Sequence, residues 1–262
     1  MKNALQIYGQ LRTFEKSLPS LLKFINYYNT DYDVFLLIDK SHASTYESNS
    51  PSNYSMENMY ILVSMLGATN LKKIQYTDEF TDAERSQEEY LSKEYQNLWQ
   101  KFSMRHNNII KNDFATALKY RTYLLNQMRI QYELQTGIVY DYVIRTRFDW
   151  ATNIDMIYNI NNDTTPILFS DALTIGTPEF VNKEAELGLV YPFTPKCLFD
   201  DDCNLLIEKY KKYETWRGDK FIDKHWIFMP ELNQRLFLLE NSYNFIEAWW
   251  KEPSNYGFKI IR

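Results

Sequence analysis

Residues 33–38 read Asp33-Val-Phe-Leu-Leu-Ile38, an acidic residue followed by a continuous apolar run. Such a run is typical of a central strand in a parallel sheet, because helices cover both faces of that kind of sheet. A shorter β-type run, Ala4 to Tyr8, precedes it and ends at Gly9. Between the two runs, apolar residues recur at helical spacing from about Phe14 to Tyr28. The chain therefore opens with a β-α-β unit, which predicts an α/β protein with an open, mostly parallel (mixed) sheet and helices on both faces.

The rest of the chain continues in alternating strand and helix patterns. We expect helices over Met56–Leu66, about Asp82–Ile110, Asn112–Gln135, Asp200–Tyr213 and Pro230–Glu240, and strands over Leu71–Tyr76, Tyr140–Arg147 and Ile167–Ser170. The strand at Leu71–Tyr76 is expected at an edge of the sheet, and the strand ending at Arg147 in its middle. From Ser170 to Glu179 we expect a strand end, a short loop and a helix that starts at Thr177-Pro178-Glu179.

Length, charge and cysteine content exclude several classes of protein. A chain of 262 residues without an internal repeat suits one large α/β domain. The net charge of −5 and the lack of a long basic run argue against nucleic acid as the main partner. The two cysteines, Cys197 and Cys203, match neither a disulfide scaffold nor a zinc site. No window approaches the ~20 apolar residues of a membrane span, so we expect a soluble, cytoplasmic protein without a transmembrane segment.

The segment from Tyr140 to Asp149 carries an unusual group of charges. Side chains alternate across a strand, so Arg145, Arg147 and Asp149 share one face at its carboxyl end. Ligands of open α/β sheets bind outside the carboxyl ends of the strands. The guanidinium fork of arginine matches phosphate oxygens, and a carboxylate can hold Mg²⁺ or Mn²⁺ against them. A diphosphate fits this group of residues, and the alternative is a salt bridge between Asp149 and one of the arginines.

Three further positions are candidates for a site. Gly9 allows close approach of the backbone to a ligand, and Arg12 after Gln10 could reach a phosphate; a tight turn with a solvated arginine is the alternative. Asp39 follows the second strand and could meet a ribose or a base. Asp171 follows the strand at Ile167–Ser170 and is the first candidate for a general base, although a turn-forming aspartate is an alternative.

Four blocks of the sequence, taken in order, resemble a family of glycosyltransferases of the GT-A type. They are Gly9-Gln-Leu-Arg-Thr-Phe14, Asp31-Tyr-Asp-Val-Phe35, Tyr140-Asp-Tyr-Val-Ile-Arg-Thr-Arg-Phe-Asp149 and Asp171-Ala-Leu-Thr-Ile-Gly-Thr177, with a weaker late block at Pro230-Glu231. The family occurs in large DNA viruses of algae and amoebae and in bacterial surface-polysaccharide clusters. The resemblance implies a GT-A fold, a nucleotide-sugar donor and a divalent metal held by an Asp-x-Asp element. That element reads Arg147-Phe148-Asp149 here, so the first aspartate is replaced by arginine.

The resulting hypothesis is a glycosyltransferase that moves a sugar from a nucleotide-diphosphate sugar of the UDP or GDP type to a hydroxyl of a glycan or other acceptor. Gly9, Gln10, Arg12, Asp39, Arg145 and Arg147 are expected to bind the donor, Asp149 to hold Mn²⁺ or Mg²⁺, and Asp171 to act as the catalytic base. We expect a single domain over residues 1–262, with a nucleotide-binding half to about residue 150 and an acceptor-binding half from about residue 151. A viral protein would act in the host cytoplasm. The alternatives are a sugar-nucleotide nucleotidyltransferase and a non-catalytic nucleotide-binding or scaffold protein.

Overall fold

The computed structural model describes residues 2–11, 14–27, 31–40, 55–104, 115–148, 150–152, 166–169, 173–191, 233–235, 237–238, 241–243, 245–247 and 258–260. The helices are α1 (Phe14–Tyr27), α2 (Met56–Leu66), η1 (Thr77–Glu79, a 3₁₀ turn), α3 (Asp82–Ser103), α4 (Ala115–Thr136) and α5 (Pro178–Val190). The strands are β1 (Lys2–Gly9), β2 (Asp31–Ile38), β3 (Leu71–Tyr76), β4 (Tyr142–Arg147), β5 (Trp150–Thr152), β6 (Ile167–Phe169), β7 (Leu173–Gly176), β8 (Ile246–Glu247) and β9 (Phe258–Ile260).

The main sheet has the strand order β3-β2-β1-β4-β7-β6-β8. The first four strands in this order are parallel to one another, β7 runs antiparallel to both of its neighbours, and β6 and β8 are parallel. β5 and β9 form a separate antiparallel pair. The expected α/β class and mostly parallel, mixed sheet are confirmed, with β3 at one end of the order and β4 in its middle.

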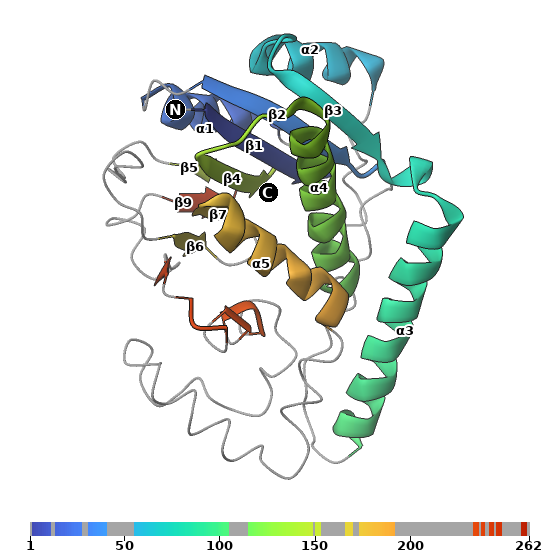
Figure 1. The fold of residues 1–262 in the computed structure, drawn as a ribbon. Coiled ribbons are helices and arrows are strands. Elements are labelled where there is room, and N and C mark those ends of the chain that lie inside the picture. The colour runs from blue at the N-terminus through green and yellow to red at the C-terminus, as the bar shows by residue number, and fades with distance from the viewer. Residues whose placement is uncertain are drawn as a thin grey trace. The chain divides into compact units, whose positions relative to one another are not determined.

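The two faces of the sheet are covered differently. On one face, buried side chains of α1 and α2 join those of the strands in a single hydrophobic cluster, which includes Leu5, Leu36, Ile144, Phe14 and Leu62. Figure 1 shows α4 lying across the opposite face. There Tyr132 of α4 meets Phe35 of β2 edge to face, with ring centroids 5.5 Å apart. Helices therefore cover both faces, as the continuous apolar run of β2 predicts.

The segment expected to be a short loop before α5 is a strand, β7. Leu173 and Ile175 are each 1% exposed, and the strand pairs with β4 on one side and β6 on the other. The prediction of a loop was wrong, because four residues are too few to show an alternating pattern and their burial depends on strands elsewhere in the chain.

A buried carboxylate joins the amino ends of the first strands. Asp33 of β2 accepts a hydrogen bond of 2.8 Å from the Tyr140 hydroxyl and forms ion pairs with Lys2 at 3.2 Å and Lys72 at 3.3 Å. Burial, and then the bond to Asp33, raise the pKa of the Tyr140 hydroxyl. These contacts link β2 to its neighbours β1 and β3, and so support the alignment of their carboxyl ends.

The chain divides into two compact units. The first contains Met1–Phe80, Leu124–Asn182 and Asn244–Arg262, and with them all the strands named above. The second contains Thr81–Tyr123 and Lys183–Tyr243, so the division passes through α4 and α5. Every candidate site residue belongs to the first unit. The expected single domain with halves that meet near residue 150 stays a prediction.

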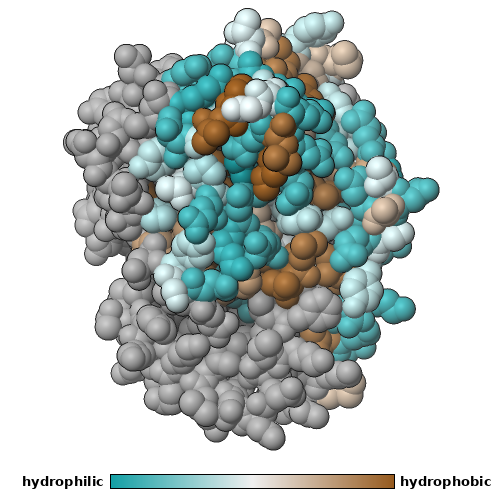
Figure 2. Space-filling model, viewed as in Figure 1, coloured by the Kyte–Doolittle hydropathy of each residue, from teal (hydrophilic) through white to brown (hydrophobic). Residues whose placement is uncertain are grey.

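Exposed hydrophobic side chains are scattered over the described surface. Large hydrophobic residues that are exposed include Met56 and Tyr60 on α2, Leu134 near the end of α4, and Val139 just after it. On the face seen in Figure 2, hydrophobic residues form separate patches among hydrophilic ones. Among the described residues, no helix is both long enough and apolar enough to cross a membrane.

Candidate functional site

The carboxyl ends of β2, β1 and β4 meet at one edge of the sheet, which we call the carboxyl edge. The register aligns Gly9 with Ile38 and Tyr8 with Arg147. From β1 the chain proceeds to β2 and β3 on one side, and only later to β4 on the other, so the strand order reverses between β1 and β4. In open α/β sheets, ligands bind outside the carboxyl ends of the strands at such a reversal. The carboxyl edge is therefore the first place to look for a ligand site.

Gly9 ends β1 in a conformation that suits glycine. Its φ of 111° lies in the region that side chains disfavour, and no atom of the described residues lies within 4 Å of the position of an added Cβ. The Gly9 carbonyl accepts a 2.9 Å hydrogen bond from the backbone N–H of Asp39. Gln10 follows and is half-buried, whereas Arg12 lies outside the described residues. Gly9 and Asp39 thus lie side by side, with Gln10 next to Gly9 in the chain; their expected role in binding a donor stays a prediction.

The acidic residue after β2 is held by the segment that follows β3. Asp39 is 8% exposed, and its Oδ1 accepts a 3.2 Å hydrogen bond from the Thr77 hydroxyl. Beside it, Lys40 forms a 3.0 Å ion pair with Asp78 and lies over the Tyr76 ring at 4.0 Å. The sequence analysis identified Asp39 but missed its neighbours Thr77, Lys40, Asp78 and Tyr76. A signal was present, because polar residues follow both β2 and β3, and the carboxyl ends of parallel strands lie at one edge.

The two arginines of β4 share a face but not an environment. Arg145 is 2% exposed, and its guanidinium donates to the Thr174 hydroxyl of β7 at 3.4 Å. Burial lowers the pKa of Arg145 to about 10; the neighbouring charge of Arg129 adds to this, while Tyr8 opposes it. Arg145 is still a cation at neutral pH. Arg147, nearest the carboxyl edge, is only half-buried and is the better placed of the two to meet a ligand.

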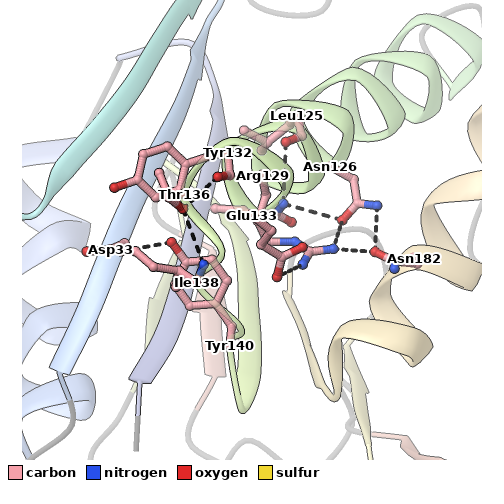
Figure 3. A network of polar contacts seen from close by, with 11 residues as sticks. Asp33, Leu125, Asn126, Arg129, Tyr132, Glu133, Thr136, Ile138, Tyr140 and Asn182 are labelled. Atoms are coloured by element: carbon pink, nitrogen blue, oxygen red, sulfur yellow. Dashed lines mark hydrogen bonds and ion pairs between the residues drawn. The ribbon is translucent and has the colours of Figure 1, made fainter.

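Arg145 belongs to the face of the sheet that polar groups connect to α4. Figure 3 shows the hydrogen bonds by which Asn126 and Arg129 of α4 reach Asn182 of α5. Gln6, the neighbour of Arg145 on β1, donates to the Leu125 carbonyl and the Asn126 side chain at 3.4 Å each. Arg129, fully buried, donates to Asn126 at 3.2 Å and also to Asn182. We call Gln6, Asn126, Arg129 and Asn182 the polar layer.

Arg129 of the polar layer also forms an ion pair with the partly buried Glu133. The Arg129 guanidinium lies 2.6 Å from the carboxylate of Glu133, one turn further along α4. Burial lowers the pKa of Arg129, against the effect of Glu133, and burial raises the pKa of Glu133, against the effect of Arg129. Gln6 of β1, which pairs with Arg145 in the sheet, is held to α4 by directional hydrogen bonds.

Asp149 and Asp171 lie outside the described residues, but the residues that flank them are at the carboxyl edge. The backbone N–H of Phe148 donates to the Tyr8 carbonyl at 3.2 Å, and the Phe148 carbonyl accepts from Ser17 of α1. Phe169 pairs with Leu173, which also pairs with Thr146 near the end of β4. Phe148, Phe169 and Leu173, which lie close to Asp149 and Asp171 in the sequence, are therefore near the end of β4.

A divalent metal has no donor set within the described part of the chain. No group of three or more His, Cys, Asp or Glu side chains lies there in a position to hold an ion. Of the Arg147-Phe148-Asp149 element, the described residues are Arg147, which is a cation, and Phe148, which is apolar. The assignment of Asp149 to Mn²⁺ or Mg²⁺ stays a prediction.

Comparison with known proteins adds no relative. No protein-family model matches the chain, and no curated protein sequence matches it. The observations that bear on function are therefore those of the carboxyl edge and of the polar layer behind it.

Proposed function

We propose that this protein is a glycosyltransferase that moves a sugar from a nucleoside-diphosphate sugar of the UDP or GDP type to a hydroxyl of a glycan or other acceptor. One observation carries the proposal: Gly9, Gln10, Asp39 and Arg147 converge at the carboxyl edge, where the strand order reverses. The four residues come from three strands far apart in sequence. They combine an open backbone turn, a carboxylate and a guanidinium, which suit a nucleoside and its diphosphate.

The proposed reaction needs charge stabilisation above all. The bond between the anomeric carbon and the diphosphate oxygen breaks, and the acceptor oxygen bonds to that carbon. The acceptor proton passes to a carboxylate, for which Asp171 is the candidate. The leaving diphosphate gains negative charge, which Arg147 is placed to stabilise, with Arg12 as a further candidate. Buried Arg145 adds positive charge on the same face of β4.

A divalent cation is part of the proposal only through Asp149. Mn²⁺ or Mg²⁺ bound there would neutralise part of the diphosphate charge. Arg147 occupies the position of the first aspartate in the Asp-x-Asp element and brings a positive charge of its own. The proposal therefore stands with or without the ion, and the two cases differ in their response to a chelator.

Release of nucleoside diphosphate tests the function. The protein is incubated with a panel of UDP-, GDP- and dTDP-sugars with Mn²⁺, and free nucleoside diphosphate is measured. We expect release from at least one donor, and loss of most of it in Arg147→Ala. Lys73→Ala, which removes one exposed cation from the same sheet, serves as the control and is expected to keep the wild-type rate.

The same assay separates the alternatives. A nucleotidyltransferase would release pyrophosphate from a nucleoside triphosphate and a sugar phosphate, and would leave nucleotide sugars intact. A scaffold protein would do neither. Absence of nucleoside diphosphate from every donor, with properly folded protein, would contradict the proposed function.

A further inference from the structure

Three consecutive residues at the end of β3 hold two consecutive residues at the end of β2. The Thr77 hydroxyl donates to Asp39 Oδ1 at 3.2 Å, and Asp78 Oδ2 lies 3.0 Å from Lys40 Nζ. The Tyr76 ring lies under the same ammonium group, 4.0 Å from ring centroid to Nζ. We call Tyr76, Thr77 and Asp78 the β3 clamp.

The β3 clamp is itself fixed. Its backbone begins where Tyr76 pairs with Ile38, the last residue of β2. The backbone N–H of Tyr76 donates to Glu79 Oε2 at 3.2 Å, which closes the 3₁₀ turn of η1. On its other side Asp39 is tied to β1 through the 2.9 Å bond to the Gly9 carbonyl. Asp39 is therefore held from both neighbouring strands, its backbone N–H by Gly9 and its carboxylate by Thr77, beside the open turn at Gly9.

A carboxylate at this place suits one part of a nucleotide. It repels phosphate, but it accepts hydrogen bonds from hydroxyl groups, and its two oxygens have about four acceptor positions, with the Thr77 hydroxyl among their donors. In nucleotide-binding α/β sheets, an acidic residue of this kind takes the ribose 2′-hydroxyl. Arg147 lies on the opposite side of β1 and suits the diphosphate. The order β2-β1-β4 thus predicts a nucleotide with its ribose toward β2 and its diphosphate toward β4.

We propose that Thr77 is a positioning residue that makes the site selective for ribonucleotides over 2′-deoxyribonucleotides. Its hydroxyl holds the Asp39 carboxylate where that group accepts a hydrogen bond from the ribose. The inference rests on the proposed function, whose donor of the UDP or GDP type is a ribonucleoside-diphosphate sugar.

Calorimetric titration of the full chain with UDP, GDP and their 2′-deoxy counterparts tests this inference. Wild type is expected to bind one ribonucleotide about tenfold more tightly than its deoxy form, because a site built for a hydroxyl rejects the analogue that lacks it. Thr77→Val is expected to raise Kd for the ribonucleotide about tenfold and to leave Kd for the deoxynucleotide nearly unchanged. Thr77→Ser, which keeps the hydroxyl, is expected to restore selectivity.

The control lies at the other end of the same strand. Thr69 is exposed and lies just before β3 begins. The Thr69→Val variant is expected to bind both nucleotides as the wild type does. Thr77→Ala removes the same hydroxyl with a smaller side chain and takes the place of Thr77→Val if circular dichroism shows that the valine variant is unfolded. A merely structural role for Thr77 would weaken binding of both nucleotides alike.

The outcomes separate the inference from the function beneath it. Equal binding of ribo- and deoxynucleotides by wild type would overturn the inference and leave the glycosyltransferase proposal standing. Selectivity that survives removal of the Thr77 hydroxyl would overturn the role given to Thr77. Failure of every nucleotide to bind would overturn the proposed function together with the inference.

Discussion

Arg145 and Arg147 are two residues apart on one face of β4, and their exposure predicts opposite effects of replacement. Arg145→Ala opens a cavity beside Thr174 and is expected to cost about 2–4 kcal/mol of unfolding free energy. Arg147 is half-buried. Arg147→Ala is therefore expected to change the unfolding free energy by about 1 kcal/mol or less, and to weaken UDP binding about tenfold. Urea unfolding and calorimetric titration of the two variants check this. Equal loss of stability in both would contradict the division of roles.

Asp149 decides whether the proposed reaction uses a metal. If it holds the ion, Asp149→Asn is expected to fold normally and to lose about two orders of magnitude or more in transfer rate, because charge stabilisation of the leaving diphosphate is removed. EDTA is expected to silence the wild type in the same way, and Mn²⁺ or Mg²⁺ to restore it. Full activity in EDTA would refute the metal assignment. Unfolding of Asp149→Asn would favour the alternative salt bridge.

At the scale of elements, the second unit contains a close approach of two helices. A Cβ added to Gly188 of α5 would lie 2.3 Å from the backbone carbonyl oxygen of Lys119 and 2.7 Å from the Tyr123 Cβ, both on α4. Glycine to alanine inside a helix ordinarily stabilises by about 1 kcal/mol. Here we expect Gly188→Ala to destabilise by about 2 kcal/mol or more, because backbone must move to make room.

Thermal unfolding of Gly188→Ala measures this effect. Glu186→Ala, on the exposed side of the same helix, is the control; it removes a surface ion pair with Lys183 and is expected to cost about 0–1 kcal/mol. A Gly188→Ala protein as stable as wild type would show that α4 and α5 separate at little cost.

In the first unit, hydrogen bonds between buried polar side chains connect the sheet, α4 and α5. Between the sheet and the later part of α4, the polar layer adds hydrogen bonds among Gln6, Asn126, Arg129 and Asn182 (Figure 3) to apolar contacts such as that of Phe35 with Tyr132. Buried polar groups of this kind are costly when a partner is lost, so they favour one arrangement of α4 and α5 over its alternatives.

For the molecule as a whole, we expect nucleotide binding to increase the thermal stability of the folded protein. A nucleotide that binds only the folded protein raises its melting temperature. We expect UDP, and with a smaller effect GDP or dTDP, to raise Tm at millimolar concentration, and Arg147→Ala to reduce the rise. Differential scanning fluorimetry with and without Mn²⁺ measures it. No rise with any of the three nucleotides, in either condition, would remove the support for a nucleotide site at the carboxyl edge.

Much of the fold follows from local patterns. The apolar run of β2, the alternation of β4 and the glycine after β1 are visible in the sequence because each depends on neighbouring residues. They predicted the opening β-α-β unit and the mostly parallel sheet. Arg12, Asp149 and Asp171 lie outside the described residues, so their roles stay predictions.

The tertiary structure decided what depends on distant residues. Only strand pairing shows that β4 joins β1, that the order reverses there, and that Leu173–Gly176 is a strand. Only packing shows that Arg145 is buried, and that Thr77 reaches Asp39 across 38 residues of chain. The physical reason is the same in each case: partners chosen by pairing and burial across the whole sheet leave no periodic trace in the few residues concerned.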